Sequence, residues 1–292
     1  MGFFAEFSAW LSALLATFIT TQTAALAAAL EPALTLLATL YVMGWGVLQA
    51  SGKIEEPLLE GARRIARIAL VLGVGLKLWL YNAVLVDTFF NAPGQLAAAL
   101  IGAPDSVTIV DKIIFQGGDA AAALIQKGGL LDGNFAFYLA GFFVYACVGI
   151  AAVYTIFLLS LAKVALSILL ALGPLFIAGL LFDASRRFFD AWLAQLANYA
   201  LLAVLTTLVV SLLMQLLTTT ATQAAAQGTD IDIASGIRLC FACGLIFLVL
   251  RQTMPMASGL AGGIALSTHH AFSHSSAWVG RQIANPRLRT IH

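Results

Sequence analysis

The sequence predicts an all-helical protein that crosses a membrane several times. Of its 292 residues, 61% are hydrophobic and 10% are charged, whereas a soluble domain has about a quarter of its residues charged. The apolar residues stand in long uninterrupted runs, which is typical of helices that span a bilayer. The net charge of +1 is too small for nucleic-acid binding through a strong positive field.

Five segments are long and apolar enough to cross a hydrocarbon layer of ~30 Å, which takes about 20 helical residues. Residues 32–86 are expected to form two spans with a cytoplasmic loop between them, and residues 136–257 a bundle of three more. The predicted spans are 33–50, 66–86, 136–161, 191–217 and 237–256.

Residues 1–31 are predicted to form an amphipathic helix on the periplasmic side rather than a span. Apolar residues recur at steps of three and four, so they share one helix face, and Ser8, Ser12 and Gln22 fall on the other. Glu31-Pro32 is expected to start a new helix, since Pro fits a first turn. No basic residue precedes Lys53, so no cleavable signal peptide is expected. The apolar stripe comprises Phe4, Phe7, Leu11, Leu14 and Phe18.

The apolar stretch 164–182 is interrupted by Gly173-Pro174, and the positive-inside rule decides how it is treated. A full crossing would divide the basic residues almost evenly between the two sides. A broken hairpin that enters the membrane and returns to the same side leaves only Lys112, Lys127 and Arg238 on the periplasmic side. All other basic residues except Lys77, which stands within a span, are then cytoplasmic. The sequence therefore predicts a re-entrant hairpin, a periplasmic N-terminus and a cytoplasmic C-terminus.

Two further segments are expected to lie outside the bilayer core. Residues 87–135 form an acidic periplasmic loop with a helix after Pro104 and breaks at Gly117-Gly118 and Gly128-Gly129. Residues 183–192 form a short helix at the cytoplasmic interface, either as a topological anchor or as a docking surface. Its interface side chains are Arg186, Arg187, Phe188, Phe189 and Trp192, and residues 258–292 follow the last span as a basic cytoplasmic tail.

No motif of an enzyme, a cofactor or a metal site stands out. The chain lacks a phosphate-binding loop and a nucleophile elbow. Cys240 and Cys243 lie one turn apart in an apolar run and are interpreted as small packing residues. The histidines of the tail have no carboxylate or thiolate near them, which favours a solvated tail over a metal centre; they are His269, His270 and His274.

Lys77 is the single most unusual residue, because it stands in the middle of a predicted span. Intramembrane charges usually face a bundle interior, a cavity or a partner, and the alternative is snorkelling towards an interface. Lys77 is therefore a candidate for a substrate path or a subunit interface. Small residues four apart suggest close helix packing, namely Ser258 with Gly262 and Gly259 with Gly263.

Three stretches resemble a known family. Residues 172–182, residues 185–192 with Asn198-Tyr199, and the proline followed by an Ala/Gly-rich helix at 251–267 are similar to the polytopic inner-membrane subunits of type IV secretion systems. These subunits are the sixth component of the VirB series and its TrbL-like relatives. None of the three stretches is catalytic, so they identify a family rather than a mechanism.

The resemblance implies a platform or channel in the bacterial inner membrane, which supports pilus or stalk assembly and passes DNA or protein. The implied partners are secretion ATPases, a bitopic scaffold subunit, a minor-pilin stalk and the major pilin, around a homo-oligomeric ring of five subunits. Residues 1–31 and 87–135 would then face the stalk or pilin, and the helix 183–192 and the tail 268–292 would face the cytoplasmic subunits.

Two other functions stay open at the level of sequence. A secondary transporter or permease would use broken helices such as Gly173-Pro174, but the sequence shows no paired break and no carboxylate within an apolar run. A purely structural membrane scaffold needs the same helix packing as a channel and differs from it only in having no path for substrate.

Overall fold

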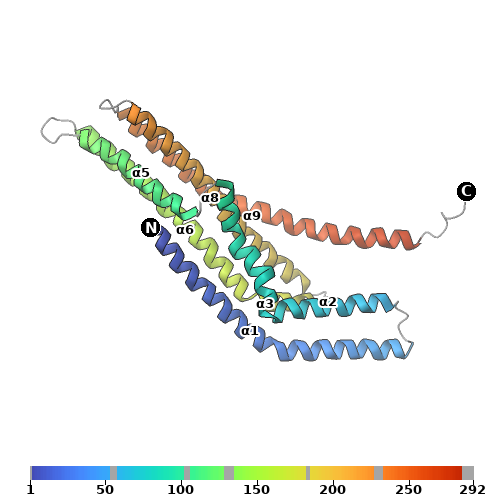
Figure 1. The fold of residues 1–292 in the computed structure, drawn as a ribbon. Helices are drawn as coiled ribbons and strands as arrows, with labels where there is room; N and C mark the ends of the chain where they lie inside the picture. Colours follow the sequence, from blue (N-terminus) through green and yellow to red (C-terminus); the bar gives the residue numbers. More distant parts are fainter. Residues whose placement is uncertain are drawn as a thin grey trace, which may run out of the picture.

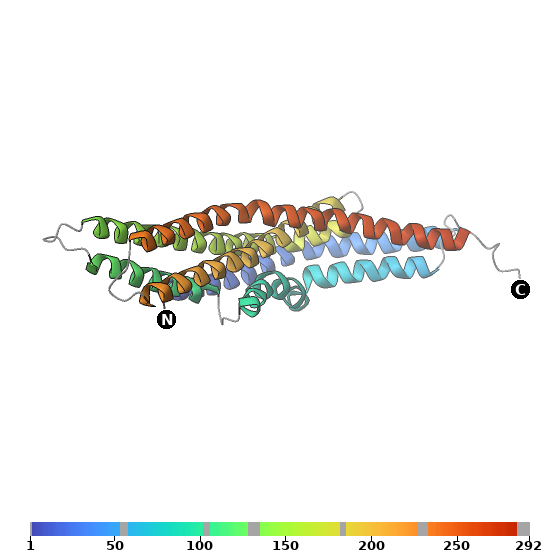
Figure 2. The ribbon, with the colours of Figure 1, turned by 90° about the horizontal axis from the view of Figure 1, so that it is seen from above.

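A computed structural model describes residues 2–52, 58–101, 106–127, 135–181, 185–226 and 233–284, and every regular element in these ranges is a helix. The predicted all-helical class is therefore confirmed. The long helices pack in an elongated bundle, from which the last part of α9 and the last part of α1 with α2 extend as two separate arms (Figures 1 and 2). In chain order the elements are α1 (Phe3–Ala50), α2 (Leu58–Leu76), α3 (Leu78–Tyr81), the π-helix η1 (Asn82–Asn91), α4 (Ala92–Ile101), α5 (Ser106–Lys127), α6 (Phe135–Ala171), α7 (Gly173–Ala178), the 3₁₀ helix η2 (Gly179–Leu181), α8 (Arg186–Ala226) and α9 (Ile233–Ala284).

Each predicted span overlaps a segment that is long and apolar enough to cross a membrane. Four helices of the described residues meet this criterion, and a bent pair of helices makes a fifth if it is counted as one span. The sidedness predicted from the basic residues stays a prediction. The segments are α1, α6, Arg186–Leu216 of α8, Cys240–Gly262 of α9, and the pair Ile68–Leu76 with Leu78–Leu100.

The first helix differs from its prediction, because α1 runs without interruption from Phe3 to Ala50 and contains Pro32. The expected new helix at Glu31-Pro32 does not exist; instead α1 bends partway along its length (Figure 1). Proline removes one backbone hydrogen bond and kinks a helix, but the apolar sequence on both sides favours continuation. The predicted amphipathic helix 1–31 and the predicted span 33–50 are thus two parts of one 48-residue helix.

The second predicted span, 66–86, is not straight. It breaks at Lys77, where the backbone is extended (φ −92°, ψ 104°), and the two pieces meet at 86°. Gly73 and Gly75 precede the break and lower the helix propensity of this turn. Beyond it, the chain forms the π-helix η1, a wide helix type that is rare and often marks functional sites.

The stretch 164–182 is not a hairpin of its own. Its first half completes α6, a 37-residue helix, and its second half forms α7 and η2. The break predicted at Gly173-Pro174 does occur there, because α6 ends at Ala171 and Pro174 stands in the first turn of α7. Lys163 does not end α6, since Lys is a good helix former whose ammonium group finds hydroxyl acceptors on α1.

The predicted loop 87–135 is largely helical. It contains the end of η1, α4 and α5, and α5 packs in the core with α6, α8 and α9. Gly117-Gly118 does not break α5, since the helix runs through to Lys127. Instead a Cβ atom at Gly117 would lie 2.5 Å from Val148 Cγ1, so this glycine permits close approach of α6. The second expected break, Gly128-Gly129, lies outside the described residues.

Two large groups and one small group of buried side chains hold the bundle together, and the small group comprises Ala162 of α6, Leu202 of α8 and Ala257 of α9. The first joins α5, α6, α8 and α9 around Val110, Val144 and Leu250. The second joins α1, α2, α3, η1, α6, α7 and α8 around Tyr81, Leu170 and Trp192. The second group lies where the bent pair of helices meets the break at Gly173-Pro174, and it buries Tyr81 of the bend together with Gly173 and Pro174 of the break.

The last two predicted segments merge with long helices. Residues 186–192 are the first turns of the 41-residue α8 rather than a separate interface helix, and 182–184 lie outside the described residues. The predicted tail begins inside α9, which is 52 residues long and continues past Pro255 to Ala284. Residues 285–292 lie outside the described part of the chain.

Candidate functional site

The break at Gly173-Pro174 creates a backbone carbonyl that needs a new hydrogen-bond donor. In a continuous helix the N–H of residue 174 would bond to the Leu170 carbonyl, but proline has no N–H. The Tyr81 hydroxyl from α3 donates to this carbonyl, and the Thr23 hydroxyl from α1 donates at 3.5 Å. Three segments far apart in the sequence therefore meet at one atom.

Neighbouring groups complete this site, which we name the junction. The Trp192 indole N–H donates to the Leu169 carbonyl at 2.8 Å, and Phe176 stacks on the Trp192 ring with centroids 5.8 Å apart. Gly173 has no side chain to displace Tyr81; a Cβ atom there would overlap the Tyr81 hydroxyl. The junction comprises Thr23, Tyr81, Leu169, Leu170, Gly173, Pro174, Phe176 and Trp192.

Trp192 accordingly lies inside the protein, with 2% of its surface exposed, whereas the sequence predicted contact with headgroups. Phe189 packs beside it at 5.5 Å between centroids. Phe188 is exposed, and the Arg187 guanidinium lies over its ring at 5.0 Å. A role in cytoplasmic contacts stays a prediction for Arg186, Arg187 and Phe188.

Lys77 is exposed and forms the corner of the bent pair. Its backbone carbonyl accepts from the Tyr81 N–H at 3.0 Å, so the corner residue starts the turn that carries Tyr81 to the junction. Trp79, two residues on, is also exposed. The contact of Lys77 with substrate or another subunit stays a prediction. The sequence did not predict that Lys77 stands at a bend.

The apolar stripe predicted on α1 faces outward, and the inward face of the helix combines apolar residues such as Leu15 and Ile19 with hydroxyl groups. Phe7, Leu14 and Phe18 are exposed, and Phe4 and Leu11 are partly exposed. Ser8 and Ser12 face the protein, where the Lys163 ammonium group donates to their hydroxyls at 3.0 and 2.7 Å.

The start of α1 is capped by a residue from the predicted loop. The Phe4 and Ala5 N–H groups donate to the two carboxylate oxygens of Asp111 at 3.2 and 3.0 Å. A carboxylate at this position satisfies free N–H groups and favours the positive end of the helix dipole. Gly2 leaves room for Asp111, because a Cβ atom there would overlap the carboxylate.

The predicted packing residues of α9 face outward. Ser258, Gly259 and Gly262 are exposed, and nothing lies within 4 Å of a Cβ atom built on either glycine. Within the chain, α9 instead buries Thr253, Ala257 and Ala261, which share another face. Gly263 continues the helix, but its side-chain surroundings are outside the described part.

The described residues offer no cluster of three metal-binding side chains. His269, His270 and His274 stand on α9, and their side chains lie outside the described set. The chemistry that the junction does provide is hydrogen bonding between protein groups, which fixes helix positions.

Sequence reasoning found Gly173, Pro174 and Lys77 but missed Thr23, Tyr81, Asp111 and Lys163 as tertiary partners. One signal was available, since Pro174 by itself shows that the carbonyl of residue 170 needs another donor. The identity of that donor depends on contacts 89 and 147 residues away along the chain.

Comparison with known proteins gives a consistent assignment. Residues 38–253 match the family described as "TrbL/VirB6 plasmid conjugal transfer protein". The chain is similar to the type IV secretion system protein VirB6 of Brucella abortus biovar 1 (29% identity over 187 residues, 61% of this chain and 54% of the relative) and to that of Bartonella quintana (27% over 179 residues, 59% and 54%). It is also similar to an uncharacterized protein of Rickettsia felis (26% over 221 residues, 70% and 22%). The chain thus spans about half the length of the VirB6 relatives that it matches.

Proposed function

The chain belongs to the TrbL/VirB6 family, a non-enzymatic membrane component of type IV secretion systems, and from this premise we propose that it is an inner-membrane platform or channel subunit. In this role it supports assembly of a pilus or stalk and lets DNA or protein substrate cross the inner membrane. The role requires no cofactor.

The observation that carries the proposal is the length of the four longest helices. Helices α1, α6, α8 and α9 have 48, 37, 41 and 52 residues. At ~1.5 Å per residue, such helices are roughly 55–78 Å long, whereas the hydrocarbon core of a bilayer is ~30 Å thick. Large parts of the bundle therefore extend past the bilayer, where a platform would contact soluble partners.

The outward apolar faces support assembly into a ring. In the most apolar 18-residue stretch of α1, only 11% of the residues are buried within the chain. Phe7, Leu14 and Phe18 of α1 stand on the outside, as do the small residues Ser258 and Gly259 of α9. Lipid covers such faces in part, and small residues allow close helix contacts between subunits. The resemblance to this family supports the proposal of a homo-oligomeric ring of five copies.

The partners are assigned from the predicted sidedness. The start of α1 and the helices of 87–135 face a minor-pilin stalk and the major pilin. The first turn of α8, with Arg186 and Arg187, and the end of α9 face secretion ATPases and a bitopic scaffold subunit.

A secondary transporter is the first alternative function. The breaks at Lys77 and Gly173-Pro174 are neighbours, since a Cβ atom at Gly75 would lie 3.2 Å from Ile177 Cγ2, and paired breaks surround the binding sites of many transporters. At the junction, however, the space is filled by buried side chains such as Tyr81 and Leu170. The carbonyl oxygen of Leu170 bonds to protein hydroxyls rather than facing a cavity, which favours a structural role for the breaks.

The proposal is tested by purifying the chain through a C-terminal tag at native expression level in mild detergent. Co-purification of secretion ATPases, scaffold subunit and pilin with a homo-oligomeric ring is the expected result. A monomer or dimer without these partners, from cells that express the whole machinery, contradicts it and favours the transporter. The double replacement of Arg186 and Arg187 by Glu is expected to impair assembly, and unchanged assembly and transfer would refute that interface.

A purely structural scaffold is the second alternative, and Lys77 distinguishes it from a channel. A photo-crosslinking amino acid at position 77 reacts with substrate in transit if the bend lines a path. Crosslinks to substrate support the channel, whereas crosslinks to lipid and neighbouring subunits alone support the scaffold.

A further inference from the structure

Two side chains of opposite charge are exposed near the middle of separate candidate spans. Arg251 stands midway along the apolar segment Cys240–Gly262 of α9, and Asp87 lies well inside Leu78–Leu100, the longer piece of the bent pair. Both side chains are exposed. A charge that faces lipid at such a position is costly, and charged groups within a membrane usually pair with one another or face a cavity.

The two charges lie beside the same stretch of α6, although the predicted sidedness placed Asp87 in the periplasm and Arg251 in the cytoplasm. On the α9 side, Phe247 packs on Tyr154 of α6 with ring centroids 5.1 Å apart. On the η1 side, Leu85 belongs to the same buried group as Leu166 of α6. The helices therefore bring both charges to the middle part of the bundle.

Within one copy the two charges do not pair. Asn91 Nδ2 donates to Asp87 Oδ1 at 2.8 Å, which leaves Oδ2 able to accept. Among the described residues, the Arg251 guanidinium makes no hydrogen bond and no ion pair. Pro255 adds a further open group, because it has no N–H to donate to the Arg251 carbonyl. Lys77 stands at the corner where the piece that carries Asp87 begins, and so not beside Asp87.

The helices that carry the charges lie at opposite edges of the bundle. α9 runs along one edge and η1 with α4 along the other (Figure 2), and α8 packs against both sides. A contact between two different faces of one chain is heterologous, and it generates a ring when the rotation between copies closes. Opposite charges at opposite edges therefore meet between neighbouring copies of a ring.

The surface around each charge suits contact between helices. Arg251 borders a groove of about 810 Å³ that is formed by α9 alone, at the level of Pro255. On the other edge, the exposed Leu96 and Leu100 of α4 offer apolar surface. Nothing lies within 4 Å of a Cβ atom built on Gly94, and such a position lets another helix approach closely. The groove is lined by Leu245, Leu248, Val249, Arg251, Gln252, Pro255 and Met256.

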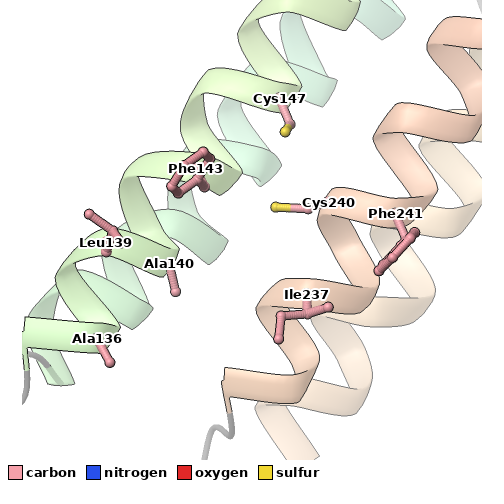
Figure 3. A pocket seen from close by; sticks show the side chains of 8 residues that line it. All are labelled: Ala136, Leu139, Ala140, Phe143, Cys147, Ile237, Cys240 and Phe241. Carbon is pink, nitrogen blue, oxygen red and sulfur yellow. The ribbon is translucent and has the colours of Figure 1, made fainter.

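The part of α9 before this groove has a different surface. An apolar cleft of about 350 Å³ separates it from the first part of α6, and Phe143, Ile237 and Phe241 are among the residues that line it (Figure 3). No residue that lines this cleft is charged, so lipid chains are sufficient to cover it. The charge at Arg251 sets the groove apart, because lipid chains do not satisfy a guanidinium group.

We propose that Arg251 of one copy forms an ion pair with Asp87 of the next copy, with the groove of α9 seated on the η1–α4 face. The inference rests on the proposed function, because it names the contact surface of the homo-oligomeric ring. Each copy presents α9 to one neighbour and η1–α4 to the other. Every Arg251 and every Asp87 is therefore paired once the ring has closed.

The first experiment is disulfide crosslinking between two differently tagged copies. In the full chain Cys147, Cys240 and Cys243 are replaced by alanine, and one copy then carries Asp87→Cys and the other Arg251→Cys. Both are expressed together in cells with the whole secretion machinery, and the membranes are oxidised with copper–phenanthroline. We expect a reducible dimer that carries both tags.

The matched control for this crosslink is Arg238→Cys in place of Arg251→Cys. Arg238 is also an exposed arginine of α9, but it precedes the apolar segment. With Asp87→Cys it should give no dimer, and neither should Asp87→Cys or Arg251→Cys expressed alone.

The second experiment tests the ion pair with native cysteines in place. Asp87→Asn and Arg251→Gln each leave one uncompensated charge, so the dissociation constant between copies should rise by roughly 100-fold or more. The double variant leaves no charge and should dissociate less than either single variant. Native mass after dilution in mild detergent measures the ring, and Asp119→Asn, at an exposed position of α5, should match the wild type.

The possible failures are distinguishable. A ring that co-purifies with its secretion partners but forms no dimer between positions 87 and 251 refutes this interface and leaves the platform standing. Dimers between identical positions indicate a two-fold contact and refute it as well. A double variant that dissociates as readily as the weaker single variant refutes the ion pair. A chain that purifies as a monomer without partners refutes the platform, and the interface with it.

Discussion

The replacement Tyr81→Phe is the most direct test of the junction. It removes one oxygen atom from a side chain with 1% of its surface exposed and leaves the aromatic ring in place. The Leu170 carbonyl then keeps only the long hydrogen bond from Thr23, 3.5 Å between oxygen atoms, because Pro174 offers no N–H.

The expected cost follows from the acceptor that is left behind. A buried polar group that loses its partner costs about 1–3 kcal/mol, and hydrogen bonds between membrane helices are worth about 0.6–2 kcal/mol. We therefore expect Tyr81→Phe to lower the free energy of unfolding by about 1–2 kcal/mol. At about 2–4 °C per kcal/mol for a large domain, the melting temperature falls by roughly 2–8 °C.

The assay is thermal unfolding of the purified chain in detergent, followed by tryptophan fluorescence. Tyr145→Phe is the matched control, because Tyr145 is exposed on α6 and the same oxygen atom is removed there. Its melting temperature should equal that of the wild type. Equal melting temperatures for Tyr81→Phe and Tyr145→Phe would refute the hydrogen-bond argument.

A double-mutant cycle ties the effect to Gly173. Gly173→Ala places a Cβ atom where the Tyr81 hydroxyl lies, and overpacking of this kind costs about 1–3 kcal/mol. In the Tyr81→Phe background the nearest clashing atom is absent, so the same replacement should cost less. Replacements of residues in contact show such coupling, whereas the free-energy costs of replacements at distant residues add. Strictly additive costs would mean that the two residues do not touch.

Two further predictions use the same assay. Asp111→Ala removes the cap of α1 and should cost about 0.5–2 kcal/mol, whereas Asp119→Ala, at an exposed position of the same helix, should have little effect; equal effects would dismiss the cap. Gly117→Ala places a methyl group 2.5 Å from Val148 Cγ1 and should cost about 1–3 kcal/mol. Gly149→Ala, where nothing lies within 4 Å, should be neutral or stabilising, since Ala favours helix by about 1 kcal/mol; the opposite order would contradict the packing of α5 on α6.

The sequence by itself determined the class of this protein. Runs of apolar residues and their length are local properties, and they predicted the five candidate spans. The break at Gly173-Pro174 was also predictable, since proline removes a hydrogen bond wherever it stands inside a helix. The motifs at 172–182, 185–192 and 251–267 were sufficient to suggest the family.

Local sequence patterns did not predict the features that depend on the surrounding solvent or on a residue far away in the sequence. The apolar stripe on α1 was visible in the sequence, but its direction was not. Phe7, Leu14 and Phe18 of this stripe face outward, as lipid around the chain permits, and the hydroxyls of Ser8 and Ser12 face inward to Lys163. The continuity of α1 through Pro32 has the same origin, because apolar surroundings favour a closed helical backbone over a break.

The tertiary structure alone decided which groups share the junction. Tyr81 and Leu170 are 89 residues apart, and Thr23 and Leu170 are 147 apart, so no periodicity in the sequence connects them. Hydropathy specifies which segments enter the membrane, but each unsatisfied backbone group and each buried charge finds its partner only when the helices have packed.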